Sequence, residues 1–470
     1  MEIPKTLKNV FMLFQRCKSG YIEELRDIVA IPSMSSSITH RHHLNTMVQW
    51  MAARLRKIGV EVSFIDLGTQ MLADGKTIPC PPIILGHYKS KPKGKTICVY
   101  GHVDVYSVKT DTWFTNPFEL TERDGKLYGR GVSDNKGQLL CWIHAIEGFQ
   151  ALGYDVPVNI KFIIEPMSAC LNYGLYESLK KQEGFLKDID YICITDTFWL
   201  GSHNPCITYS MRGVCDFLVE IDSMSENLPI EMYDGMSDMI YLLDSLVDNK
   251  GNILIPGIDK NIAPLTLEEK QFYSNIDFDM YDFSDVLGGA KLKWENDKLS
   301  MLSHLWRYHA LSIHGIENPQ ELVSNEYMSS TVKAKFSIRL VPNQTTTEIK
   351  KLVFDHFAKK WETRGSPNKL NITTIKEVSA CTEDPKSPQY SAGKRAIQLV
   401  YNKTPNLIRD GNTIPVALYL KELIGKNILF LPIFSVESGS HIANEKIFVR
   451  EYIDGTKVLA AYLREMSLLS

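Results

Sequence analysis

The sequence predicts an α/β domain that is interrupted by a second domain of α+β structure. The chain has 470 residues, more than one hydrophobic core usually serves. Short apolar runs alternate with helical patterns near both ends of the chain, and the pattern changes between about residues 208 and 382. We therefore expect an α/β domain formed by residues 1–207 and 383–470, and an inserted domain formed by residues 208–382.

The composition excludes two classes of partner. The 52 basic residues are balanced by 55 acidic ones, for a net charge of −3, so there is no electrostatic attraction for nucleic acid or an anionic membrane. No apolar stretch approaches the roughly 18 residues of a membrane helix, and the first residues lack the pattern of a signal peptide. The nine scattered cysteines form no CxxC pair. We therefore expect reduced thiols and a cytoplasmic protein.

The first domain shows strands and helices in alternation. Apolar residues spaced by three and four predict helices over residues 7–31, 42–59 and 137–153. Buried runs predict strands at 95–101, 158–164 and 190–195, and the α/β pattern returns with the runs at 396–401 and 427–434. Because a helix stands between buried strands, we expect a largely parallel sheet.

The second domain has strands with one wet face. The stretches RGVCDFLVEI and VKAKFSIRLV alternate apolar and polar residues, and in the latter the side chains of Lys333, Lys335, Ser337 and Arg339 share one side. A helix is predicted over 236–248, and capping boxes predict helix starts at Thr266 and Thr345.

Polar residues follow the predicted buried strands and stand in glycine-rich turns. They are His102, Asp104, Asp134, Asp196 and His441. Ligands of open α/β sheets bind beyond the carboxyl ends of the strands, and imidazole and carboxylate groups are ligands for zinc and manganese. Each residue alone has an ordinary explanation, such as a helix cap for Asp134. Together they favour a metal site.

Six motifs spread over the chain then identify a resemblance. GHVDVYSV, GRGVSDNKGQ, ITYSMRG, LVDNKGNILIPGI, FSIRLVPN and SGSHIANEK resemble the cytosolic nonspecific dipeptidase and carnosinase family. The resemblance implies a two-domain metallopeptidase scaffold, a lid that also forms a dimer, and cleavage of dipeptides with zinc or manganese.

The resemblance also implies roles for individual residues. His102, Asp134 and Asp196 match the ligands of one metal ion, with Asp134 bridging to a second ion that His441 would bind. Asp104 matches the aspartate that supports the catalytic site. The substrate side would consist of Arg339, which matches the arginine for the substrate carboxylate, together with His441 and Thr413 of the Gly411-Asn412-Thr413 loop.

The sequence departs from the family where a catalytic pair is expected. Ser168 stands at the position of the glutamate that acts as general base, and Ala169 stands at the position of a glutamate that binds the second metal. A hydroxyl and a methyl group perform neither task. We therefore expect one ion rather than two, and weak or no hydrolysis. Glu165 as a base, or the Cys170 thiolate as a ligand, are the substitutes nearby.

Two further departures lie in the inserted domain. Residues 221–235 contain no histidine where the family supplies one across the dimer, and Glu326 replaces a threonine within the 325–329 segment. Two hypotheses follow. The first is a degenerate dipeptidase that keeps metal and small-ligand binding, as a homodimer or paired with an active relative. The second is an active dipeptidase or carboxypeptidase that uses one metal, with Glu165 or Asp104 as base.

Overall fold

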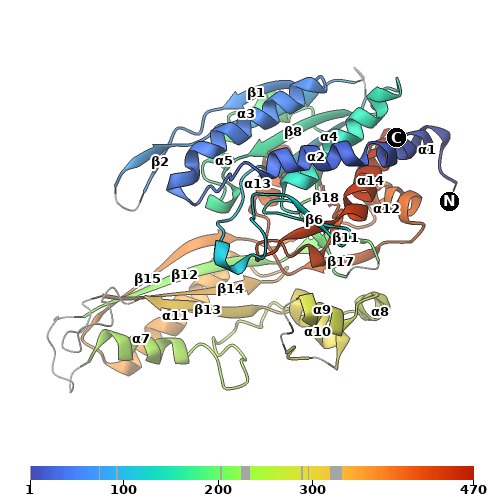
Figure 1. The fold of residues 1–470 in the computed structure, drawn as a ribbon. Coiled ribbons are helices and arrows are strands. Elements are labelled where there is room, and N and C mark those ends of the chain that lie inside the picture. The colour runs from blue at the N-terminus through green and yellow to red at the C-terminus, as the bar shows by residue number, and fades with distance from the viewer. Residues whose placement is uncertain are drawn as a thin grey trace.

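A nine-stranded sheet forms the centre of the larger part of the molecule (Figure 1). This computed structural model describes residues 2–72, 75–90, 94–201, 204–223, 233–286, 289, 291–294, 296–317 and 331–469. The strand order is β1-β4-β8-β5-β9-β18-β11-β16, with β17 also beside β11. The strands are β1 (Glu61–Ile65), β4 (Ile83–Tyr88), β5 (Thr96–His102), β8 (Asn159–Glu165), β9 (Tyr191–Ile194), β11 (Cys206–Met211), β16 (Cys381–Thr382), β17 (Asn406–Asp410) and β18 (Ile428–Phe430).

The centre of this sheet is parallel and its flanks are mixed. Strands β8, β5, β9 and β18 run parallel, as the buried runs predict. Strands β1 and β4 add antiparallel at one edge, and β11 pairs antiparallel with β18 and β16. The antiparallel pairs lie outside the parallel centre. The periodicity of a single strand does not indicate the direction in which that strand pairs, so the sequence did not predict these pairs.

Helices cover both faces of the sheet. One face packs against α1 (Lys5–Arg16), α2 (Lys18–Val29), α3 (Arg41–Lys57), α4 (Lys136–Ala151), α12 (Pro388–Tyr401) and α14 (Val449–Ser467). The other packs against α5 (Leu175–Lys180), α6 (Glu183–Leu186) and α13 (Pro415–Ile424). The helix predicted over residues 7–31 is two helices that meet at Cys17, and the run at 396–401 ends α12.

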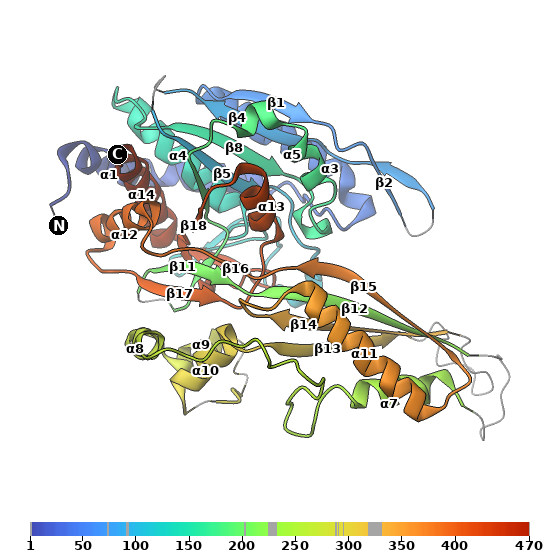
Figure 2. The same cartoon turned by 180° about the vertical axis from the view of Figure 1, so that it is seen from behind.

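A separate four-stranded sheet forms the centre of the smaller part of the molecule, for which we keep the name lid (Figure 2). Its antiparallel order is β13-β14-β12-β15, with β12 (Gly213–Asp222), β13 (Ala310–Glu317), β14 (Thr331–Leu340) and β15 (Lys369–Val378). Helices α7 (Gly235–Asp244) and α11 (Thr346–Arg364) bury its apolar face. The predicted alternation is confirmed, because Arg339 and the two lysines of β14 lie on the opposite, polar face.

Three short helices extend from the lid towards the main sheet. They are α8 (Leu267–Asn275), α9 (Met280–Val286) and α10 (Lys298–Trp306), and they pack around Trp199 and Ile408 of the larger part. Both predicted capping boxes are present, at the starts of α8 and α11.

The remaining strands form small sheets that border the site or the molecular edge. The pairs are β2 (Thr69–Met71) with β3 (Thr77–Pro79), and β10 (Phe198–Trp199) with β19 (Phe434–Ser435); β6 (Thr121–Arg123), β7 (Lys126–Tyr128) and β20 (Lys446–Phe448) form a three-stranded sheet. The chain changes sheets around Arg212 and again between Val378 and Cys381. In the described part of the chain, no helix is long and apolar enough to span a bilayer.

Candidate metal centre and substrate pocket

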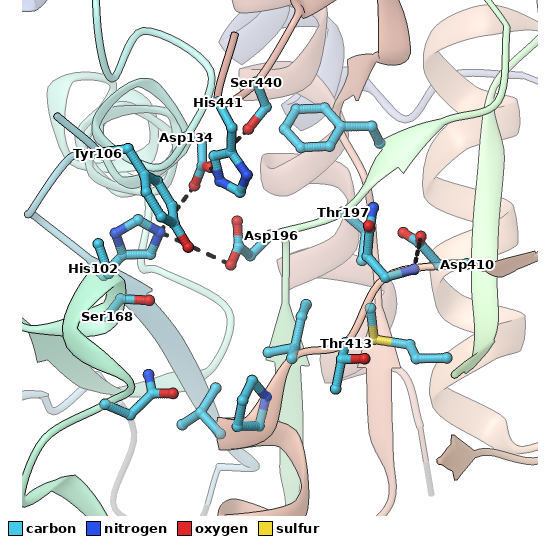
Figure 3. Close-up of a pocket in the computed structure, with 18 of the residues that line it drawn as sticks. His102, Tyr106, Asp134, Ser168, Asp196, Thr197, Asp410, Thr413, Ser440 and His441 are labelled. Carbon is cyan, nitrogen blue, oxygen red and sulfur yellow. Dashed lines mark hydrogen bonds and ion pairs between the residues drawn. The ribbon is translucent and has the colours of Figure 1, made fainter. Parts of the chain in front are cut away.

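Three of the predicted ligands meet at the carboxyl edge of the parallel strands (Figure 3). His102 ends β5, Asp196 follows β9, and Asp134 lies in the turn before α4. Their ligand atoms all lie within 4.8 Å of one another. A Cβ at residue 101 would approach the side chain of Asn135 to 2.7 Å, so Gly101 allows this turn to rest against β5.

Asp134 lies between the two histidines. Its Oδ1 is 2.9 Å from Nε2 of His102, and its Oδ2 contacts Nε2 of His441. The second carboxylate, of Asp196, lies 3.9 Å from the same His102 nitrogen. Asp134 therefore presents one oxygen to each histidine.

Asp104 supports the centre from behind. The Nδ1–H of His102 donates to the backbone oxygen of Asp104 at 3.0 Å, and Asp104 Oδ1 is 3.3 Å from the same nitrogen. Asp104 is fully buried and also accepts a 2.5 Å hydrogen bond from Ser35. These contacts fix the ring so that Nε2 faces the other carboxylates, as outer carboxylates commonly do for metal-binding histidines.

A second buried carboxylate, Glu445, holds the turn that carries Asp134. It accepts hydrogen bonds from the backbone N–H groups of Gly131, Ser133 and Asp134 at 2.9, 2.9 and 3.2 Å. Arg130 donates to it at 3.0 Å. Glu445 belongs to the same loop segment as His441, so this network joins the two parts of the chain that contribute to the centre.

The electrostatics of the cluster favour a cation. Burial, together with the negative charge of Asp134, raises the pKa of Asp196 to about 7. Burial opposes charge on His102, but Asp104 and Asp134 raise its pKa well above 6.5. Asp134 also raises the pKa of His441 against the effect of burial. Protons thus compensate the excess negative charge, and a bound divalent cation would release them.

The turn after β8 offers no acidic side chain to the pocket. Ser168 and Ala169 begin the short 3₁₀ turn Ser168–Cys170 and line the pocket. Among the described residues that line it, the acidic ones are Asp134, Asp196 and Asp410. This turn therefore contributes a hydroxyl and a methyl group where the family resemblance expects two glutamates.

The two substitutes nearby are engaged by other side chains. The Glu165 carboxylate accepts hydrogen bonds from Tyr100 and Asn172, and burial raises its pKa to about 7. The Cys170 sulfur lies 4.0 Å from the Arg41 guanidinium, and burial raises the pKa of its thiol. Neither residue lines the pocket.

The predicted substrate residues Arg339 and Thr413 meet at the boundary between the two sheets. Arg339 extends from the lid and donates a 3.1 Å hydrogen bond to the hydroxyl of Thr413, which lines the pocket. Lys376, from β15 of the lid, lines it too. The cavity has a volume of about 350 Å³, within the range of small-molecule sites.

Several pocket residues were not predicted from the sequence. The Tyr106 ring lies 4.2 Å from the His441 ring, centre to centre, and Ser440 donates to Asp134 at 2.7 Å. Tyr106 and Ser440, like Glu445, stand inside motifs that the sequence analysis quoted, so their motif was the available signal. The sequence contained no comparable signal for Lys376. The Asn325–Ser329 segment and residues 224–232 lie outside the described residues.

Comparisons with known proteins identify the family of this chain. The model of peptidase family M20/M25/M40 matches residues 98–465. The chain belongs to this family. The Beta-Ala-His dipeptidase of Rattus norvegicus is 39% identical over 474 residues, which cover 99% of this chain and 96% of that protein. The Cys-Gly metallodipeptidase dug1 of Schizosaccharomyces pombe is 34% identical, covering 99% of both.

Solved structures of M20 relatives share the whole architecture. The crystal structure of human carnosine dipeptidase 1 superposes with a TM-score of 0.92 at 38% identity, covering all of both chains. The Dug1p dipeptidase of Saccharomyces cerevisiae gives 0.91 at 34% identity, covering 98% of both. The predicted two-domain α/β metallopeptidase fold is therefore confirmed.

The donor set fits the metal dependence stated in the name of the Schizosaccharomyces pombe metallodipeptidase. Two imidazole nitrogens and two carboxylates converge from separate elements, and these are ligands that zinc and manganese accept. His102, Asp134 and Asp196 are the three that would hold one ion. His441 would complete the set through its contact with Asp134.

Proposed function

We propose that this chain is a metal-dependent dipeptidase. The observation that carries the proposal is the convergence of His102, Asp134, Asp196 and His441 in one pocket with Arg339 at its lid side. Relatives similar over the full length are named as dipeptidases, which favours the active hypothesis over the degenerate one. We also propose that the site holds one metal ion rather than two.

The lid would hold the free carboxylate of the dipeptide. Lys376 and Asp410 line the lid side of the pocket, and Arg339 lies next to it through its hydrogen bond to the pocket residue Thr413. A guanidinium binds a carboxylate with two parallel hydrogen bonds. Arg339 does not itself line the pocket, so it would have to extend past the Thr413 hydroxyl to reach the substrate carboxylate. The scissile carbonyl would then point towards the two histidines.

The ion, once bound, supplies Lewis-acid polarisation of the carbonyl and an activated water. The protein's own residues bind and orient. His102 is held by Asp104, Asp134 is held by Glu445, and Tyr106 covers His441. Without a carboxylate at Ser168, proton transfer from the water lacks a dedicated base, which in enzymes is worth roughly 10² to 10⁴ in rate.

A second candidate function is binding without turnover. Ser168 and Ala169 favour it, because they leave the pocket complete for binding and incomplete for proton transfer. In this case the protein would retain a dipeptide or a similar small molecule. Dimer formation through the lid, with itself or an active relative, stays a prediction, for which light scattering on the purified protein is the direct measurement.

A dipeptide panel separates the two functions. We expect slow hydrolysis with added zinc or manganese, abolished by His102→Ala. Each dipeptide would be tested beside its C-terminal amide, which lacks the carboxylate. Arg339→Met should remove the preference for the free acid. Binding of dipeptides without any metal-dependent release of amino acids would instead establish the binding function.

A further inference from the structure

A second pocket lies at the opposite end of the parallel strands. It has a volume of about 760 Å³, and we call it the lysine pocket because His87, Lys89, Lys161, Lys187 and Lys426 line it, with Asp188 and Asp190 as its acidic residues. Strand β5 starts at Thr96 in this pocket and ends at His102 in the metal cluster. The two sites are therefore separated by the length of the sheet.

Lys161 is built into the sheet. It lies on the central strand β8, is 3% exposed, and donates a 2.5 Å hydrogen bond to the carbonyl of Phe185. Its direct partner across the antiparallel pair is His87, another basic residue. Lysine is rarely this buried without an acidic partner, and here the residue directly opposite is a second basic side chain rather than an acidic one. This unfavourable placement of Lys161 occurs at a position that lines a cavity.

Positive charge in the lysine pocket exceeds its acidic partners. Among the described residues, no acidic side chain forms an ion pair with Lys161, Lys187 or Lys426, whereas Lys89 pairs with Glu61 at 2.7 Å. The Asp190 carboxylate is engaged by the backbone N–H of Thr96.

The neighbouring positive charges lower the pKa values of the buried basic groups. Burial lowers the pKa of Lys161, and Lys187 and Lys89 lower it further against the opposing charge of Asp188. The pKa of His87 is lowered by burial and by the positive charges of Lys161 and Lys89. An anion in the pocket would relieve this repulsion.

A smaller hollow continues from the lysine pocket to the start of α12. It shares Lys426 and Asp190 with the lysine pocket and has a volume of about 320 Å³. Gln389, in the first turn of this 14-residue helix, lines the hollow and is 1% exposed. Within the described structure, neither polar atom of its side chain has a hydrogen-bond partner, and the Ser387 hydroxyl has none. A helix N-terminus favours anions.

We propose that the lysine pocket and this hollow together bind a phosphorylated small molecule with two linked phosphate groups. One phosphate would lie among Lys161, Lys187 and Lys426. The other would accept from the Gln389 amide and the Ser387 hydroxyl at the start of α12. Lys426 stands at the junction and would contact both groups.

Calorimetric titration of the metal-loaded full-length protein tests this proposal, with inorganic pyrophosphate and inorganic phosphate as probes. We expect one pyrophosphate per chain, bound at least tenfold more tightly than phosphate. Lys187→Ala combined with Lys426→Ala should weaken pyrophosphate at least tenfold. Lys5→Ala combined with Lys8→Ala removes the same charge from exposed positions of α1 and should leave the affinity unchanged.

Gln389→Leu tests the second phosphate position. It should reduce the affinity for pyrophosphate to that for phosphate and leave phosphate binding itself unaltered. Absence of binding at millimolar pyrophosphate, or equal weakening by the two lysine pairs, would overturn the proposal. So would binding that survives the Lys187/Lys426 change and disappears with a chelator, because pyrophosphate would then occupy the metal centre.

Discussion

The backbone N–H of Ala169 donates a 2.9 Å hydrogen bond to the carboxylate of Asp104. The neighbouring N–H, of Ser168, donates to the same carboxylate at 3.1 Å. Because Asp104 also fixes the His102 ring, the turn after β8 is tied to the metal cluster through its backbone. The positions of the side chains on this turn are thus set independently of which side chains occupy them.

Restoring carboxylates to this turn should increase hydrolysis. We expect Ser168→Glu combined with Ala169→Glu to raise kcat for dipeptides by roughly 10² or more, since a positioned base contributes about 10² to 10⁴. Steady-state kinetics with saturating metal provides the measurement. Leu171→Glu, which adds a carboxylate two residues beyond Ala169, is the matched control and should leave the rate unchanged; an equal gain there would point to a general charge effect.

Removing the central carboxylate should remove the metal. Asp134→Asn keeps the shape of the side chain but loses the charge between His102 and His441, so we expect at least a hundredfold loss of zinc affinity. Metal content after dialysis against a competing chelator measures this. Asp410→Asn changes a carboxylate at the other side of the same pocket (Figure 3), and metal retention should be normal in that variant.

Glu445 should affect metal binding without touching the metal. An amide in Glu445→Gln cannot accept from all of its backbone N–H donors, so the turn that carries Asp134 would loosen. Loss of an outer-shell partner typically costs 10- to 100-fold in metal affinity. The same dialysis assay applies, and Glu437→Gln at a neighbouring position on the loop serves as control. Unchanged affinity with lowered thermal stability would assign Glu445 a purely structural role.

Glu165 should make the protein less stable as pH rises. Its pKa is raised by burial from 4.5 to about 7, so the native state binds more protons than the unfolded chain between these values. Stability from this group is therefore greatest below pH 4.5, falls through the window, and is constant above about pH 7. Glu165→Gln should remove this slope. Urea midpoints at several pH values test it, with Glu122→Gln at an exposed position as control; a slope that persists in Glu165→Gln excludes this carboxyl as its source.

Much of the metal cluster could be predicted because parallel strands end at a common edge. His102 and Asp196 follow strands that are adjacent in the sheet, and Asp134 precedes the helix that packs on them. Strand-end position is readable from one sequence. The end of the first helix at Cys17 could not be read from the sequence, because the apolar spacing continues from this helix into the next.

The supporting interactions could not be predicted because they join distant residues. Glu445 lies 311 residues beyond Asp134 in the chain, and the motif that contains Glu445 does not indicate which backbone groups its carboxylate accepts from. The direction of Glu165 depended on Tyr100 of the adjacent strand, and the place of Lys376 depended on how the lid sheet meets the larger part. Each needed the tertiary structure.

The link between Glu445 and the Asp134 turn has a consequence for biosynthesis. During translation, the turn and the strand that ends at His102 leave the ribosome more than 300 residues before Glu445 does. Until then the backbone N–H groups of the turn lack their acceptor, and His441 is absent as well. The full set of contacts around Asp134, including those from Glu445 and His441, can therefore form only after residues 441–445 have left the ribosome.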